Sequence, residues 1–182
     1  MLTKFGFPKA TSKPVYIPIN KDADLSLSKL DDIRTDLTEY RERIGSIIYL
    51  IVYTRLDITY ALGRLSQHIQ DLYERHVQAL RQLLRYLRSS VTARIRFGPT
   101  GNLVVYSDAD YASDREDRKS ITTSIGLIGG GPVFWGSRKQ TAVSTTITEA
   151  EYIAMAFTTK QGQWVAQILR DMGLGTYVYK NH

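Results

Sequence analysis

Residues 98–108 read Gly98-Pro99-Thr100-Gly101-Asn102-Leu103-Val104-Val105-Tyr106-Ser107-Asp108, and the pattern of the chain changes at this stretch. Gly98 to Gly101 are turn residues. The short apolar run from Leu103 to Tyr106 is rich in β-branched and aromatic side chains, which predicts a strand. The residues from Asp108 to Arg118 are polar and predict a loop after that strand.

Downstream of this stretch the sequence predicts more strands and then helices. Residues 125–128 and 133–135 are strand-like and flank the turn Gly129-Gly130-Gly131-Pro132, which predicts a hairpin. A third strand is expected near residues 141–144. One helix is expected from about Thr146 past Met155, and a second over about 161–172. Strands followed by helices predict a layered α/β fold.

Upstream, residues 38–90 predict three helices. Thr38 is the expected cap of the first and Asp57 of the second, and the third spans about Glu74 to Ser89. Each has one apolar face, formed in turn by Ile44, Ile47, Ile48 and Ile51, by Ile58, Ala61, Leu62 and Leu65, and by Leu80, Leu83, Leu84 and Leu87. We divide the chain into a proline-rich linker or tail (1–37), a helical segment (38–97) and a sheet-containing domain (98–182).

A neighbouring face of the third expected helix carries Arg81, Arg85 and Arg88 at spacings i, i+4 and i+7. This stripe has two interpretations. It is an ordinary solvated face, or it contacts the phosphates of a nucleic acid, because aligned guanidinium groups suit that backbone. The formal charge of +6 favours a polyanionic partner.

Composition excludes several classes of protein. There are no cysteines, which excludes disulfides and thiolate zinc sites and fits a reducing, intracellular compartment. No run approaches the roughly 20 apolar residues of a membrane helix. His68 and His76 lack the spacing of metal ligands and are expected at the surface. Trp135 is expected in the core, and Trp164 is expected to pack the last helical stretch.

The candidate chemistry lies in carboxylates. Asp108 follows a predicted strand, with Asp110 and Asp114 nearby, although aspartate is also common in ordinary turns. Thr146 and Glu149 have the spacing of a capping box. Glu151 lies about 200° around the helix from Glu149, so we assign Glu149 to the cap and Glu151 to a metal site. Carboxylates of this kind hold magnesium together with substrate phosphates.

Four motifs together resemble the ribonuclease H region of copia-type retrotransposon Pol polyproteins. They are Tyr106-Ser107-Asp108-Ala109-Asp110-Tyr111-Ala112 with Asp117-Arg118-Lys119-Ser120, then Gly129-Gly130-Gly131-Pro132-Val133-Phe134-Trp135, Ser137-Arg138-Lys139-Gln140, and Thr148-Glu149-Ala150-Glu151-Tyr152-Ile153-Ala154. Upstream, Tyr40-Arg41, Thr54-Arg55, Asp57-Ile58 and Arg85-Tyr86-Leu87 resemble the segment that joins reverse transcriptase to ribonuclease H. The resemblance covers nearly the whole chain.

The resemblance implies a ribonuclease H-like mixed sheet with flanking helices. It implies that Asp108 is the first catalytic aspartate and Glu151 the catalytic glutamate, that magnesium is the cofactor, and that the RNA strand of an RNA–DNA hybrid is cut. The reverse transcriptase region of the same polyprotein becomes a further expected partner. No membrane partner is implied, and the expected location is intracellular, in a cytoplasmic particle or the nucleus.

The sequence also departs from the family pattern. No residue here matches the family's third catalytic aspartate or its later acidic residue. Leu56 stands where the family usually has proline, and Thr123 where it usually has glycine. We therefore expect these 182 residues to form an incomplete site that cleaves slowly or not at all. Two alternatives stay open: a non-catalytic fragment that binds nucleic acid or a polymerase partner, and a structural helical connector.

Overall fold

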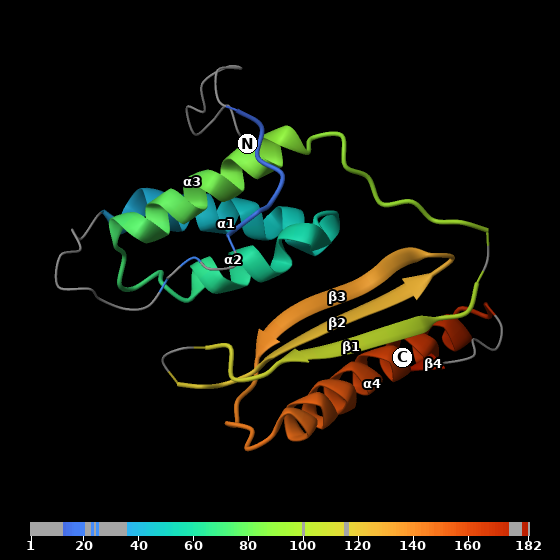
Figure 1. Ribbon diagram of the computed structural model, residues 1–182. Helices are drawn as coiled ribbons and strands as arrows, with labels where there is room; N and C mark the ends of the chain where they lie inside the picture. Colours follow the sequence, from blue (N-terminus) through green and yellow to red (C-terminus); the bar gives the residue numbers. More distant parts are fainter. Residues whose placement is uncertain are drawn as a thin grey trace. The chain divides into compact units, whose positions relative to one another are not determined.

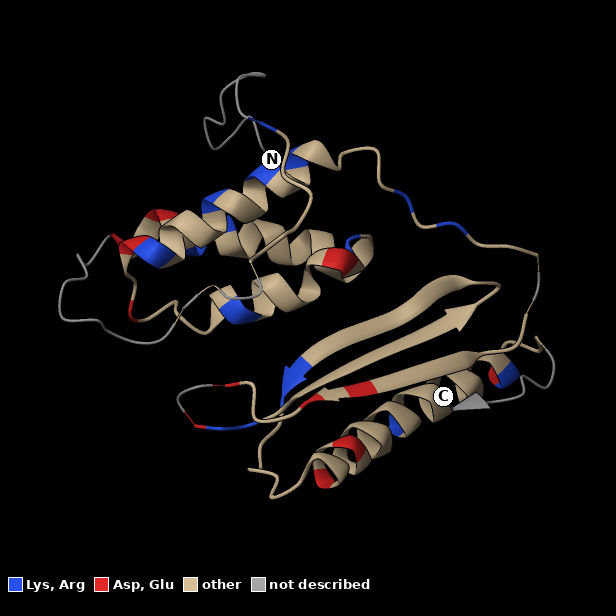
Figure 2. Ribbon diagram, viewed as in Figure 1, with Lys and Arg blue, Asp and Glu red and all other residues tan. Residues whose placement is uncertain are grey.

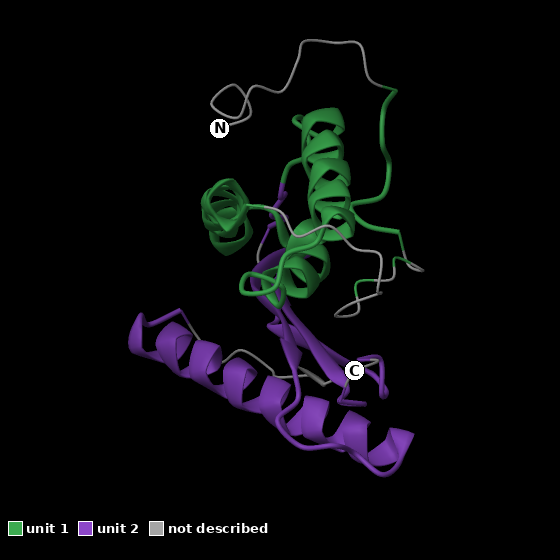
Figure 3. Ribbon diagram, turned by 90° about the vertical axis from the view of Figure 1, so that its left-hand side faces the viewer, with its two compact units in different colours: residues 1–94 green, residues 95–182 purple. Residues whose placement is uncertain are grey.

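A computed structural model of the chain contains two compact units, Met1–Arg94 and Ile95–His182 (Figure 3). It describes residues 13–20, 23, 25, 36–99, 101–114 and 117–174, and the backbone of 180–181. Most of the predicted tail, 1–37, lies outside the described residues. The assignment of 38–97 to a connection and of 98–182 to a ribonuclease H-like domain stays a prediction.

Unit 1 is helical, with α1 (Leu37–Tyr53), the short 3-10 helix η1 (Leu56–Ile58), α2 (Thr59–Ser66) and α3 (Glu74–Ser89) (Figure 1). The bounds of α3 agree with the prediction. Its four predicted leucines and the predicted face of α2 are buried in one core. On α1, Ile44 and Ile47 are buried and Ile51 is half-buried, but Ile48 is 47% exposed and its predicted burial is wrong. The buried positions Tyr40, Ile44 and Ile47 are spaced i, i+4 and i+7, and Ile48 lies about 100° beyond the last of them.

The two predicted helix caps of unit 1 are wrong. The side chain of Asp36 caps α1 by accepting a hydrogen bond from the backbone N–H of Thr38, at 2.8 Å. Asp57 lies inside η1, and its carboxylate accepts bonds from Arg55 and from the hydroxyl of Tyr86 instead. An aspartate beside an arginine that is only 9% exposed serves as its counter-ion in preference to a cap.

The two histidines of unit 1 are buried, which corrects the expected surface location. His68 is 5% exposed and His76 is fully buried, and their rings stack with centroids 4.1 Å apart. The Nδ1 atom of His76 accepts from the backbone N–H of Tyr73 at 3.1 Å. The neutral ring therefore carries its hydrogen on Nε2, which donates to the carbonyl of Leu25 at 3.3 Å.

Unit 2 contains a sheet of order β3-β2-β1-β4 and is α/β, as predicted. Its strands are β1 (Val104–Asp110), β2 (Ile121–Ile128), β3 (Gly131–Lys139) and β4 (Lys180–Asn181). The first three pair antiparallel, and β4 pairs parallel with β1. The predicted hairpin is confirmed. Its two central residues, Gly129 and Gly130, have φ of 57° and 74°, the left-handed conformation that a tight two-residue hairpin needs.

One long helix, α4 (Ile147–Asp171), covers one face of this sheet (Figure 1). The prediction of two separate helices is wrong. A single stripe of small residues at i+4 spacing is buried along α4, and it lets the helix lie close to the sheet along its length: Ala150, Ala154, Thr158, Gly162 and Ala166. Trp164 lies outside this stripe and is 63% exposed, contrary to its predicted packing, and Trp135 is half-buried.

The predicted strand near residues 141–144 is also absent from unit 2, where these described residues form a loop. Strand β3 continues to Lys139 because it pairs with β2 as far as Ile121. The chain then leaves the sheet, and the loop joins β3 to the start of α4.

Candidate active site

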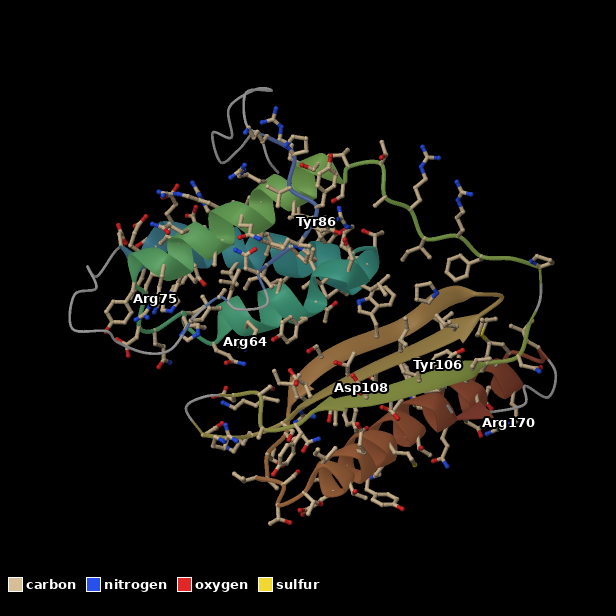
Figure 4. All side chains as sticks on the ribbon, viewed as in Figure 1. Arg64, Arg75, Tyr86, Tyr106, Asp108 and Arg170 are labelled. Atoms are coloured by element: carbon tan, nitrogen blue, oxygen red, sulfur yellow. The ribbon has the colours of Figure 1, made fainter. Side chains whose placement is uncertain are left out.

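Asp108 lies within β1 and not after it, which corrects the predicted loop. The antiparallel ladder continues to the pairs of Asp108 with Thr123 and of Asp110 with Ile121. Alternation along the strand buries Val105 and Ala109 on the face toward α4 and leaves Asp108 and Asp110 exposed on the other. Figure 4 shows Asp108 on this strand.

Glu151 is half-buried and lies in the second turn of α4. Ile153 and Phe157, on the same helix, line a small hollow with Thr122 and with Arg138 of β3, so they mark the flank of α4 nearer β3. Glu151 is two residues before Ile153, about 200° around the helix. It therefore lies on the opposite flank of α4, toward the outer edge of β1.

Close packing of small residues brings the two segments together. Ala109 forms one buried cluster with Ala150 and Ala154, and these alanines neighbour Asp108 and Glu151 in sequence. The hydroxyl of Tyr111, just after β1, donates to the carbonyl of Thr145, just before α4, at 3.2 Å. Figure 2 shows the acidic parts of β1 and of the first turns of α4 at the same end of unit 2.

The edge of β1 beside Asp108 is open. In the sheet, β4 pairs only with Val104 and Val105, and within the part of the chain that the structure describes no strand pairs with this edge at Asp108. The side chain of Glu151 is long and lies on the flank of α4 toward this edge. A cation beside the edge can therefore be reached from both faces of the strand.

Glu149 has the structural role predicted for it. The hydroxyl of Thr146 caps α4 by accepting from the backbone N–H of Glu149 at 3.1 Å. The carboxylate of Glu149 reaches one residue further back than a capping box requires and accepts from the N–H and hydroxyl of Thr145, at 2.7 and 2.8 Å. These bonds lower the pKa of Glu149, which leaves Glu151 as the other carboxylate at this end of α4.

Gln140 fixes the start of α4 against the sheet and was not singled out from the sequence on its own. Its side-chain amide is 5% exposed and donates to the hydroxyl of Thr122 and to the carbonyl of Ala150, each at 3.0 Å. Its amide oxygen accepts from the hydroxyl of Ser144 at 3.1 Å. Since Ala150 precedes Glu151, Gln140 positions the predicted site through the helix backbone.

Asp114 does not join Asp108, because it anchors the loop between β1 and β2. Its buried carboxylate accepts from the ammonium group of Lys139 at 2.6 Å. The same ammonium group lies 3.0 Å from Asp117. Burial alone would lower the pKa of Lys139, but its bonds to the two aspartates outweigh burial and raise it.

The candidate site thus offers two carboxylates to a metal ion. Among the described residues, no group of three or more His, Cys, Asp or Glu side chains is placed to hold a metal. The donor set is nevertheless of the right chemistry for magnesium, which binds oxygen ligands and is commonly held by one or two carboxylates plus substrate phosphates.

The three arginines of the predicted stripe have different surroundings in unit 1. Arg81 contacts Glu74 at 3.1 Å, and Arg85 donates to the carbonyl of Lys13 at 3.1 Å. Both line a hollow of about 500 Å³ between α3 and residues 14–20. Arg88 is half-buried one turn further on and does not line this hollow.

No family model and no solved structure matches the chain. Its curated relatives are informative. The retrovirus-related Pol polyproteins from transposons RE1 and RE2 of Arabidopsis thaliana are 42% and 39% identical to it over 166 residues. These matches cover 90% of this chain but 11% of each polyprotein. The secreted RxLR effector protein 161 of Plasmopara viticola is 42% identical over 128 residues, which are 69% of this chain and 90% of that protein.

The matches to transposon polyproteins extend beyond one organism. A further Pol polyprotein, from transposon TNT 1-94 of Nicotiana tabacum, is 37% identical over 136 residues. None of the helices formed by the described residues has the length and apolar character needed to cross a membrane. The chain belongs to the family of copia-type, retrovirus-related Pol polyproteins of transposons.

Proposed function

We propose that this chain supplies the ribonuclease H-like region of a copia-type Pol polyprotein and acts on the RNA strand of RNA–DNA hybrids. The observation that carries the proposal is the packing of Ala109 against Ala150 and Ala154. It brings the strand that holds Asp108 and the helix that holds Glu151 together at the open edge of β1.

The architecture of unit 2 is compatible with this proposal. Three antiparallel strands precede a long helix on one face of the sheet, and a parallel strand lies next to β1. This is a mixed sheet with its candidate carboxylates on the first strand and the first helix of the unit. The ribonuclease H-like fold is proposed from this arrangement together with the family.

Asp108 and Glu151 are the proposed catalytic residues, and both would hold magnesium through carboxylate oxygens. When bound with substrate, magnesium ions in such sites activate a water molecule and stabilise the leaving oxygen of a phosphodiester. Asp108 contributes a carboxylate fixed by the β1–β2 ladder. Glu151 contributes one from a helix whose start is fixed by Gln140 and by the Thr146 cap.

Binding of the hybrid would rest on its phosphates. Helix α3 carries four arginines and one acidic residue, Glu74. Arg81, Arg85 and Arg88 are the proposed phosphate contacts, since guanidinium groups form charge-assisted bonds to phosphate oxygens. The reverse transcriptase region of the same polyprotein is the proposed protein partner.

The proposal is tested by cleavage of an end-labelled RNA–DNA hybrid with magnesium. Two carboxylates hold one magnesium loosely and are a poor clamp for two ions, so the 182-residue chain should cut slowly or not at all. A longer chain that supplies further carboxylates should cut, and Asp108→Asn or Glu151→Gln should abolish its activity.

Asp171→Asn is a matched control for these two variants. Asp171 ends α4, about 30 Å along the helix from Glu151 at 1.5 Å per residue, and this variant should keep full activity. Magnesium-dependent cleavage that survives Asp108→Asn would contradict the assignment. Hybrid binding without cleavage by the longer chain would favour a second function, a non-catalytic hybrid-binding module, which the pair of carboxylates in unit 2 also suits.

A further inference from the structure

The hollow in unit 1 has two different walls. One is formed by Gln78, Arg81, Gln82 and Arg85 of α3. The other is formed by the extended segment at residues 14–20, which contributes Pro14, Val15, Ile17 and Asn20. The volume of about 500 Å³ lies within the range of roughly 300–1,000 Å³ that is usual for small-molecule sites.

The extended wall is tied to α3 at successive turns of the helix. The backbone N–H of Val15 donates to the hydroxyl of Ser89 at 3.1 Å. Arg85 donates to the carbonyl of Lys13 at 3.1 Å. The side-chain amide of Gln82 donates to the carbonyl of Ile17 and to the side-chain oxygen of Asn20, at 3.3 and 3.2 Å. The hollow is therefore shaped before a ligand arrives.

Its charge is positive. No carboxylate lines the hollow. Arg85 donates to a neutral carbonyl, and its Nε atom is buried and has no hydrogen-bond partner. Arg81 pairs with Glu74, but the two side chains are 56% and 40% exposed, and such an exposed pair contributes little and exchanges readily for another anion.

We infer that this hollow binds one unpaired nucleotide of a single-stranded nucleic acid. Its phosphate would lie between the guanidinium groups of Arg81 and Arg85, and its base against the apolar wall of Pro14, Val15 and Ile17. The inference rests on the proposed function only in taking nucleic acid as the partner.

A concave site favours a single strand over a duplex. In a duplex the bases are stacked inside and the phosphates lie on a convex surface, so only the phosphates could approach this hollow. In a single strand a nucleotide can swing out and place its base in a pocket. The paired guanidinium groups and the apolar wall lie on opposite sides of the same hollow, which matches the two chemically different ends of a nucleotide.

The test measures binding of a labelled single-stranded DNA of about 12 nucleotides by fluorescence anisotropy, without magnesium, next to a blunt RNA–DNA hybrid of the same length. The variant Arg81→Gln with Arg85→Gln should weaken single-strand binding roughly tenfold or more, because each removes a charge-assisted bond. Arg75→Gln with Arg94→Gln is the control, since it removes the same charge outside the hollow.

A second variant, Gln78→Trp, fills the hollow and leaves the charge unchanged. It should weaken single-strand binding roughly tenfold and change hybrid binding much less. A nucleoside 5′-monophosphate should compete with the single strand at far lower concentration than inorganic phosphate.

Three results would overturn the inference: unchanged single-strand binding by Gln78→Trp, equal losses in the two double arginine variants, or equal competition by the nucleotide and by inorganic phosphate. These measurements involve neither Asp108 nor Glu151. Failure here therefore leaves the cleavage proposal standing, and failure of cleavage leaves this inference standing.

Discussion

Replacing Gln140 by alanine should destabilise unit 2 and loosen the start of α4. The substitution removes three hydrogen bonds from a buried amide. It also leaves two buried hydroxyl groups, those of Thr122 (4% exposed) and Ser144 (3% exposed), without this partner. An unsatisfied buried group costs about 1–3 kcal/mol. Because the smaller side chain leaves room for water to replace part of the network, we expect a loss of about 2–3 kcal/mol.

The assay is urea unfolding followed by tryptophan fluorescence. Both tryptophans, Trp135 and Trp164, lie in unit 2, so the signal reports on that unit alone. A loss of about 2–3 kcal/mol should lower the urea midpoint by roughly 1–2 M. Gln167→Ala is the matched control, because Gln167 lies on the same helix and donates to Asp171 at an exposed site. It should cost no more than about 0.5 kcal/mol.

Gln140→Glu separates the donor role of this amide from its volume. At neutral pH a carboxylate cannot donate to the carbonyl of Ala150, and its buried charge adds a desolvation cost. This variant should therefore be at least as unstable as Gln140→Ala. A stability of Gln140→Ala within about 0.5 kcal/mol of the parent, or a stable Gln140→Glu, would refute the positioning role.

Three further predictions concern other parts of the chain. In unit 1, burial alone would raise the pKa of Asp57, but bonds from Arg55 and Tyr86 outweigh it and hold the pKa below its ordinary value of 3.8. The stability contributed by Asp57 is therefore present above pH 3.8 and lost as the pH falls through its folded pKa; Asp57→Asn should lower the free energy of unfolding at neutral pH, followed by circular dichroism, and reduce its decline in acid. Gly129→Ala should cost about 1 kcal/mol more than Gly130→Ala in urea unfolding, because a Cβ at Gly129 would lie 2.7 Å from the carbonyl oxygen of Gly98 whereas a Cβ at Gly130 meets nothing within 4 Å. Alanine at all three stripe arginines, Arg81, Arg85 and Arg88, should reduce the salt dependence of hybrid binding by about one unit of slope for each phosphate that the chain no longer binds, and an unchanged slope would contradict the stripe.

Regular periodicity made parts of the fold predictable from the sequence. Helix α3 matched because Leu80, Leu83, Leu84 and Leu87 mark one face without ambiguity. The same periodicity held a signal that we did not use: His76 lies four residues before Leu80 and therefore falls on the buried face of α3. The glycine pair at Gly129 and Gly130 specified the hairpin turn through its backbone conformation.

The rest depended on contacts distant in sequence. Ser107 to Asp110 are too polar to predict a strand, and only their pairing with β2 extends β1 through Asp108. No local pattern shows that Gln140 bonds Ala150, ten residues away. Asp108 and Glu151 were singled out by family motifs, and the packing that brings their segments together comes from alanines that carry no chemical signal themselves.

The most direct measurement asks whether Asp108 and Glu151 hold the same divalent cation. Mn²⁺, a paramagnetic substitute for magnesium, can be added below stoichiometry to the isotope-labelled chain with bound RNA–DNA hybrid, and the backbone amide signals followed by NMR. We predict that the signals of Asp108 and Glu151 broaden together, and that either Asp108→Asn or Glu151→Gln removes the broadening at both positions. Broadening at only one of them, or broadening that survives both variants, would contradict a shared site.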